Sequence, residues 1–236
     1  MKYFIPKQPM NKNYLLLFII ILHFTNYTIA QEKNAPKISK FSIGINAGPN
    51  YNSLRGDSFA DKYKSNFNYF LGLSLQYKIN KHFSVVTNLN YEQSPFKSEY
   101  RSGPKNWADT YMIKDKTTFT HLNIPVLLQY NLGVYNEFFI NGGIFYNPII
   151  KVSNEMINTD TGDNISDLDF NELFKKKNYG LSLGIGMNFK FDKRDNVSVE
   201  IRDDFGLNDI GATKLGNIST TKTNSIKLVF NWSLNL

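Results

Sequence analysis

Residues 179–191 read YGLSLGIGMNFKF, and this stretch decides the fold class. Its odd-numbered positions are all apolar or aromatic, whereas its even-numbered positions carry Gly, Ser, Asn and Lys. Successive side chains of a β-strand point to opposite faces, so the pattern predicts a strand with one apolar face and one small or polar face. The chain after residue 30 shows almost no helical periodicity, and we therefore expect an all-β protein.

Seven further segments alternate in the same way, at residues 41–47, 67–77, 83–93, 119–130, 138–150, 197–207 and 224–236. The connections between them alternate strictly between short ones, at 78–82, 131–137 and 192–196, and long ones, at 48–66, 94–118, 151–178 and 208–222. Outer-membrane barrels have short periplasmic turns and long external loops, and an even strand count suits closure of the first strand on the last. We predict an eight-stranded antiparallel up-and-down transmembrane β-barrel.

A soluble barrel of the lipocalin type is the structural rival, because it too has one apolar face per strand. The polar face of a soluble barrel meets water and should be rich in Lys and Glu, whereas the polar faces here hold mainly Gly, Ser and Asn. Aromatic residues also gather near both ends of the predicted strands, as in the two girdles of a membrane barrel. These features favour location in the outer membrane.

The first 30 residues have the order of a secretory signal peptide. The apolar run LLLFIIIL at 15–22 follows Lys12 and precedes the small-residue site Thr28-Ile29-Ala30. This run is shorter than the ~20 residues that a membrane-spanning helix needs, so we expect cleavage after Ala30 rather than an uncleaved anchor. Translation begins at Met1 or Met10. The predicted organisation is a signal peptide at 1–30, a short periplasmic segment at 31–40 and the barrel domain at 41–236.

Composition excludes several classes of function. The 236-residue chain has no Cys, three His and a formal net charge of +7. It therefore lacks thiolate metal sites and cysteine nucleophiles, and its charge is too mild to indicate nucleic-acid binding. No phosphate loop, zinc motif or nucleotide fingerprint occurs, and the acidic residues at 160–172 do not have the spacing of an EF-hand. We expect no metal, no cofactor and no enzymatic activity.

Charged and imidazole side chains are rare on the predicted polar faces. The candidates for the lumen are Glu92, His121, Lys190, Glu200, Arg202 and Lys227. Eight strands leave room inside only for side chains, and buried charges must be paired. We therefore predict a network of ion pairs that plugs the lumen, with a proton- or solute-conducting path as the alternative.

Two further residues have a chemical and a structural interpretation. A lipid hydrolase would need Ser, His and a carboxylate in one hydrogen-bonded line, but no spacing marks Ser182 or Ser198 as a nucleophile for His121. Pro125 interrupts a strand, where it removes a ladder donor, and its functional interpretation is a gate or bend. A structural His and a local bulge or weakly paired position at Pro125 are the favoured interpretations.

Several strands resemble those of one family. Residues 44–48, GINAG, followed by Asn50-Tyr51, resemble the opening strand of the PorT-like outer-membrane β-barrel family of Bacteroidota. Residues 121–130, HLNIPVLLQY, resemble its central strand, and residues 141–143 and 179–189 are similar to the strands that follow. The resemblance implies an integral outer-membrane protein. The namesake member is linked to type IX protein secretion, and most relatives have no assigned activity.

The expected partners are outer-membrane lipids, lipopolysaccharide and proteins of the envelope or of a secretion system. Basic residues of the long connections are candidates for contact with lipopolysaccharide: Arg55, Lys62, Lys64, Lys97, Arg101 and Lys105. Trp107 and Tyr111 are candidate anchors for a partner protein. We expect a structural or interaction role, with accessory work in type IX secretion as one form of it. A narrow channel or a barrel that binds a small solute or lipopolysaccharide is the alternative.

Overall fold

The computed structural model describes residues 39–236 except 57–59, 104–109, 134–136, 166–170, 172–173, 191–193 and 212–219. The predicted signal peptide and most of the segment 31–40 therefore lie outside the described residues. Residues 39–235 form one compact unit. No helix in the described part of the chain has the length and apolarity needed to cross a membrane.

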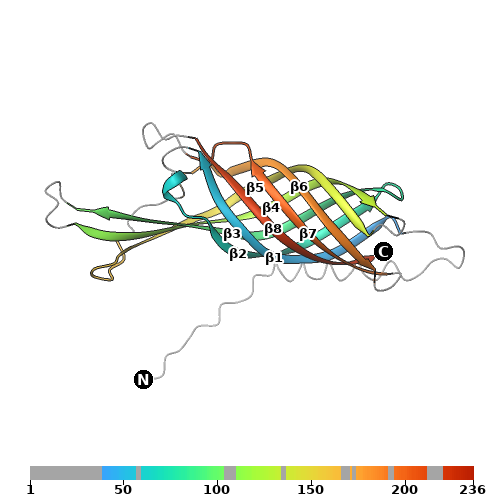
Figure 1. The fold of residues 1–236 in the computed structure, drawn as a ribbon, viewed down its shortest axis with the longest axis horizontal. Coiled ribbons are helices and arrows are strands. Elements are labelled where there is room, and N and C mark those ends of the chain that lie inside the picture. The colour runs from blue at the N-terminus through green and yellow to red at the C-terminus, as the bar shows by residue number, and fades with distance from the viewer. Residues whose placement is uncertain are drawn as a thin grey trace, which may run out of the picture. The chain divides into compact units, whose positions relative to one another are not determined.

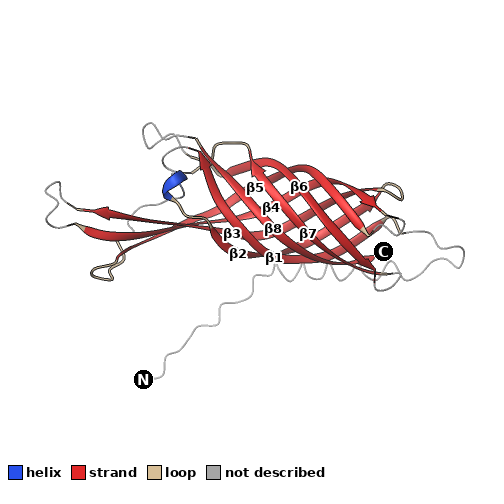
Figure 2. Ribbon diagram, in the orientation of Figure 1, coloured by secondary structure: helices blue, strands red, loops and turns tan. Residues whose placement is uncertain are grey.

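Eight antiparallel strands form a closed barrel in chain order (Figures 1 and 2). The strands are β1 Phe41–Gly56, β2 Asn66–Lys78, β3 Phe83–Ser102, β4 Tyr111–Leu132, β5 Phe138–Asn158, β6 Lys177–Lys190, β7 Asp195–Gly206 and β8 Thr221–Asn235. Strand β1 pairs with both β2 and β8, which closes the ring. A single-turn 3-10 helix, η1 (Ala60–Lys62), follows β1. The predicted eight-stranded up-and-down barrel is confirmed.

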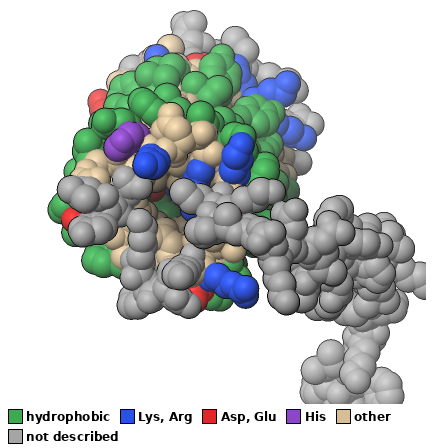
Figure 3. All heavy atoms as spheres, turned by 90° about the vertical axis from the view of Figure 1, so that its right-hand side faces the viewer, with side chains coloured by type: hydrophobic (Ala, Val, Ile, Leu, Met, Phe, Trp, Pro, Cys, Tyr) green, Lys and Arg blue, Asp and Glu red, His purple; other side chains and the backbone are tan. Residues whose placement is uncertain are grey.

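The apolar face of each strand points out of the barrel. Tyr69 is 75% exposed and Leu183 is 66% exposed, although both are large apolar side chains. The inner face instead buries amides, and Asn46, Asn50 and Asn123 are each at most 1% exposed. Seen from the end with the short turns, apolar side chains surround a centre of polar and basic ones (Figure 3). A soluble barrel has the opposite arrangement, with its apolar face inside. An apolar outer wall is typical of a barrel that lies in the hydrocarbon core of a membrane.

Aromatic pairs occur near both ends of the barrel wall. Near the short turns, the ring centroids of Phe83 and Tyr130 are 4.9 Å apart. Near the long connections, those of Tyr51 and Phe67 are 4.7 Å apart. Aromatic side chains at these two levels are typical of the two interfaces of a membrane.

Three strands continue well beyond the barrel on the side of the long connections. Residues 94–102 of β3, 111–120 of β4 and 151–158 of β5 form a three-stranded extension, here called the external sheet (Figure 1). The prediction of loops at residues 94–102, 111–118 and 151–158 was wrong, as it was for residues 48–56 of β1. In the external sheet the reason is physical: outside the bilayer neither face of a strand must be apolar, so the period-two signal that marks a membrane strand is lost. In β1, Gly48 and Pro49 have the composition of a turn although both pair with β2 within the barrel.

The pairing of β4 with its neighbours is irregular at two points. The β4–β5 register shifts between Thr120 and His121, so Ile150 and Lys151 both face outward while Ile149 and Val152 are buried. The β3–β4 register is interrupted opposite Pro125, whose carbonyl oxygen instead accepts a hydrogen bond from the Thr87 hydroxyl at 2.8 Å. Pro125 is thus a weakly paired position, and the bulge lies nearer the start of β4, at Thr120 and His121.

Candidate functional site

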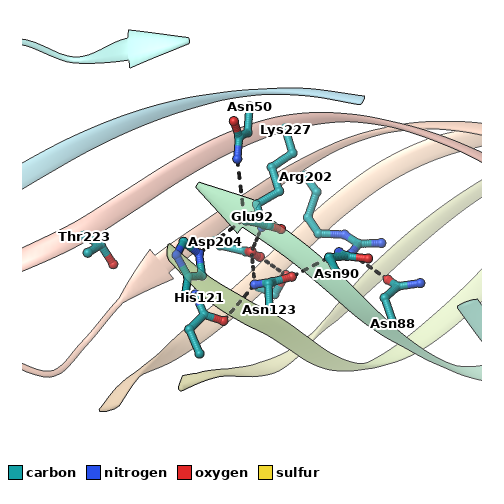
Figure 4. A network of polar contacts seen from close by, with 12 residues as sticks. Asn50, Asn88, Asn90, Glu92, His121, Asn123, Arg202, Asp204, Thr223 and Lys227 are labelled. Carbon is teal, nitrogen blue, oxygen red and sulfur yellow. Dashed lines mark hydrogen bonds and ion pairs between the residues drawn. The ribbon is translucent and has the colours of Figure 1, made fainter. Parts of the chain in front are cut away.

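The middle of the lumen holds a buried cation between two carboxylates (Figure 4). Lys227 Nζ of β8 lies 2.6 Å from Glu92 Oε1 of β3 and 2.7 Å from Asp204 Oδ2 of β7. The three side chains are at most 2% exposed. Lys227 therefore ties three strands together across the interior of the ring.

Polar side chains satisfy the remaining oxygens of these two carboxylates. Glu92 Oε2 accepts a hydrogen bond from Asn50 and lies 3.5 Å from His121 Nε2. Asp204 Oδ2 also accepts a hydrogen bond from Asn123 at 2.9 Å, and its Oδ1 accepts one from the Ser182 hydroxyl. Buried carboxylates tolerate such a site when paired and hydrogen-bonded in this way.

A second ion pair lies next to the first, on the side of the short turns. Arg202 Nε and Nη2 donate to the two oxygens of Glu200 at 2.7 and 2.8 Å, a bidentate arrangement. Arg202 Nη1 donates to Asn88 at 2.9 Å, and Asn141 donates to Glu200 at 3.0 Å. Arg202 stands directly opposite Lys227 in the β7–β8 register, so three carboxylates surround two adjacent cations.

The structure brings five of the six candidate lumen residues together: Glu92, His121, Glu200, Arg202 and Lys227. The side chain of the sixth, Lys190, lies outside the described residues. Sequence reasoning missed Asp204, although it shares its face of β7 with Glu200 and Arg202. The parity of that strand was the available signal, and the Asp203-Asp204 doublet obscured it.

An apolar plug closes the lumen above the ion pairs, at the end with the long connections. We define it as Phe96, Phe119, Ile149, Val152, Phe174 and Ile210. The Phe119 ring makes edge-on contacts with Phe96 and Phe174, with centroids 5.6 and 4.8 Å apart. Phe174 and Ile210 come from two long connections, which the backbone hydrogen bond from Lys175 N to Ile210 O joins at 2.8 Å.

Two small cavities lie on either side of the buried charges. The outer one is lined by Glu92 and Asp204 and by Phe96 and Phe119 of the plug, and the inner one is lined by polar groups that include Arg202. Each has a volume of about 30 Å³. Cavities of this size admit small numbers of water molecules. The ion pairs of Lys227 and Arg202 lie between the two cavities.

The arrangement does not assemble a hydrolytic site from the candidate residues. His121 faces Glu92, whereas Ser182 donates its hydroxyl hydrogen to Asp204, so each pairs with a different carboxylate. Within the described ranges, no group of three or more His, Asp or Glu side chains is placed to hold a metal ion. Asp160 and Asp163 are exposed, and the other acidic residues of their connection, at 167, 169 and 172, lie outside the described ranges.

Asp209 organises the connection that carries Ile210 into the plug. Its carboxylate accepts hydrogen bonds from Thr221 N–H at 2.8 Å, Lys175 Nζ at 3.0 Å and Gly211 N–H at 3.0 Å. Burial acts to raise the pKa of Asp209, but these hydrogen bonds outweigh it and hold the pKa below its ordinary value. The charged carboxylate therefore stabilises the closed connection.

We expect the β7–β8 connection, which carries Asp209 and Ile210, to become less stable at acidic pH. Because the pKa of Asp209 is lowered in the folded protein, the stability that its carboxylate contributes is complete above the ordinary pKa of 3.8. This contribution is lost as the pH falls through the lower folded-state pKa. Hydrogen-exchange protection factors of the Thr221 and Gly211 amides should stay constant from about pH 7 to pH 5 and fall in this acid range. Asp209→Asn should lower both at neutral pH and remove the acid fall. Wild-type protection that stays level through the acid range would refute this role.

Comparison with known proteins places these features in context. A family model described as "Outer membrane protein beta-barrel domain" matches residues 29–211. Among solved structures, Neisserial surface protein A (NspA) is similar with a TM-score of 0.44 and 13% identity, covering 84% of this chain and 98% of that one. The E. coli outer membrane protein W has a TM-score of 0.44 and 15% identity, covering 86% and 100%. OprG from Pseudomonas aeruginosa has a TM-score of 0.41 and 15% identity, covering 84% and 98%. No curated protein matches the chain.

Proposed function

The chain belongs to the family of the outer membrane protein beta-barrel domain, and from the closure of its lumen we propose a non-enzymatic structural or interaction role. Its location is the outer membrane, where its apolar wall contacts membrane lipids. One observation carries the proposal: Lys227 joins Glu92 and Asp204 across the interior, with the apolar plug above them. A barrel filled in this way presents its outer surface, and not its lumen, to other molecules.

Planar-bilayer recording tests the closed lumen. We expect no sustained unit conductance from the purified full-length barrel, because fixed side chains fill the interior and the buried ion pairs lie between two small cavities. An open porin reconstituted in the same bilayers serves as the positive control. Reproducible conductance steps that scale with the amount of barrel would contradict the proposal and favour the alternative, a narrow channel or small-solute binder.

The resemblance to the PorT-like family supports a narrower form of this role. Residues 44–51 and 121–130 carry that resemblance, and the namesake is linked to type IX secretion. We therefore propose accessory work in type IX secretion as the more specific assignment. Clean deletion in the native host tests it through the secreted and periplasmic proteomes. Accumulation of type IX cargo in the periplasm supports this assignment, and normal secretion removes it while leaving the closed barrel intact as a proposal.

A further inference from the structure

The outward face of the external sheet carries an excess of exposed cations. We define this basic face by its charged residues, which are Lys97, Glu99 and Arg101 of β3, Lys114 and Lys116 of β4, Lys151 and Glu155 of β5, and the adjoining Lys64. Six of these residues are basic and two are acidic. The opposite face of the same sheet is different in kind, since it packs Phe96, Phe119 and Val152 into the plug.

Three lysines of the basic face stand in one row across neighbouring backbones. Lys64 pairs with Lys97 in an isolated bridge, with Lys64 N donating to Lys97 O at 2.7 Å. Lys97 in turn pairs with Lys116 in the β3–β4 register. Directly opposed side chains of an antiparallel pair have Cβ atoms only about 4.5–5.5 Å apart, and like charges at such positions destabilise the pair.

Carboxylates of the described residues do little to neutralise this row. Glu155 lies 4.0 Å from Lys116 Nζ, and both side chains are about half exposed, so water screens the pair. Within the described ranges, neither Lys64 nor Lys97 makes an ion pair. The row is therefore a concentration of positive charge that an external anion would stabilise.

The basic face continues the membrane-facing surface of the barrel. The β3–β4 pairing keeps the same register from the lipid-facing pair Tyr91–Leu122 to the pair Lys97–Lys116. All four side chains therefore lie on the same side of the sheet. Lys151 follows the outward-facing Ile150 directly, at the bulge. At about 3.3 Å per residue and a strand tilt of about 40°, six residues rise roughly 15 Å along the membrane normal. The cations thus begin at the apolar boundary and rise through the zone of lipid headgroups.

We propose that the basic face binds the phosphate groups of an anionic glycolipid of the outer leaflet. Lys151 is placed for phosphates at the apolar boundary, and the row of Lys64, Lys97 and Lys116 for anionic groups above it. A phosphate among three ammonium groups removes their mutual repulsion and accepts charge-assisted hydrogen bonds from them. The inference rests on the proposed outer-membrane role and deepens it, because it names the ligand class of the external surface.

The test compares two triple variants of the full-length barrel. Lys64→Gln/Lys97→Gln/Lys116→Gln removes the row, and Lys176→Gln/Lys177→Gln/Lys222→Gln removes the same charge from exposed or partly exposed positions at the same end of the barrel. Each variant is first checked for folding by its heat-dependent mobility shift. Binding of bisphosphorylated lipid A is then measured in detergent by native mass spectrometry, with fully dephosphorylated lipid A as the second probe.

We expect the row variant to bind bisphosphorylated lipid A about 100-fold more weakly than wild type, since each lysine near an anionic surface contributes about a factor of five. The control variant should bind nearly as wild type, and dephosphorylated lipid A should not distinguish wild type from the row variant. Equal weakening by both variants, or undiminished binding by the row variant, overturns the proposal. So does a row variant that loses only an acidic protein partner. A conducting barrel that still shows the expected lipid binding would refute the closed lumen alone.

Discussion

Replacing Lys227 with methionine is expected to destabilise the folded barrel by about 3–5 kcal/mol, because it leaves two buried carboxylates without their cation. Glu92 and Asp204 are 0% and 2% exposed, so bulk water does not solvate the two carboxylates that lose their cation. Urea unfolding from lipid vesicles, followed by tryptophan fluorescence, measures the free energy. Trp232 in β8 is a reporter inside the strand that carries the substitution.

Two further variants separate a lost ion pair from a general defect. Lys116→Met removes an exposed lysine, and its cost should lie within about 1 kcal/mol of zero. Adding Glu92→Gln and Asp204→Asn to Lys227→Met removes the unpaired charges and should recover most of the loss. A Lys227→Met barrel as stable as wild type, or a triple variant no better than the single one, would show that the ion pairs do not hold the lumen together.

Gly184→Ala is expected to have the second-largest effect, a loss of about 2–3 kcal/mol. A Cβ atom at Gly184 would overlap Glu200 Oε1 and Asn141 Oδ1, which are both fixed in the lumen. Glu200 would have to move away from its bidentate partner Arg202. The same unfolding measurement reports this loss.

Gly142→Ala is the matched control in the neighbouring strand. A Cβ atom there would lie 3.0 Å from Leu183 Cδ2, the tip of an outward-facing side chain that is free to turn into the lipid. Its cost should be under about 1 kcal/mol. If the two alanine variants unfold together, close approach of Glu200 to the backbone is not what requires glycine at position 184.

The strand bodies were predictable because a bilayer imposes a rule on them. Each residue that faces lipid must be apolar, and residues 179–191 display that rule at nearly every position. The rule ends where the hydrocarbon ends, so 94–102 and 111–118 showed no alternation although they are strand. The bulge opposite Thr120 and His121 adds an extra residue to β5, and the sequence of residues 149–152 contains no pattern that predicts it.

The lumen residues were predictable as a set but not as pairs. Strand parity places Glu92, Arg202 and Lys227 inside, whereas contact between Glu92 and Lys227 joins positions 135 residues apart and depends on the register of the whole ring. The apolar plug could not be predicted from the sequence, for a related reason. Phe174 and Ile210 belong to connections without any periodic pattern, and hydrogen bonds between these connections and to β8 position them over the lumen.

The seam between β1 and β8 sets the order in which the molecule can be completed. Ser42 and Asn235, whose side chains meet at this seam, are 193 residues apart in the chain. The six pairs from β1–β2 to β6–β7 do not involve β8, whereas the β7–β8 and β1–β8 pairs must await this last strand. That strand also brings Lys227 to Glu92 and Asp204. Until β8 is in place, Glu92 and Asp204 therefore lack their cation. Pairing of β8 with β1 and β7 supplies this positive charge together with the backbone hydrogen bonds that close the barrel.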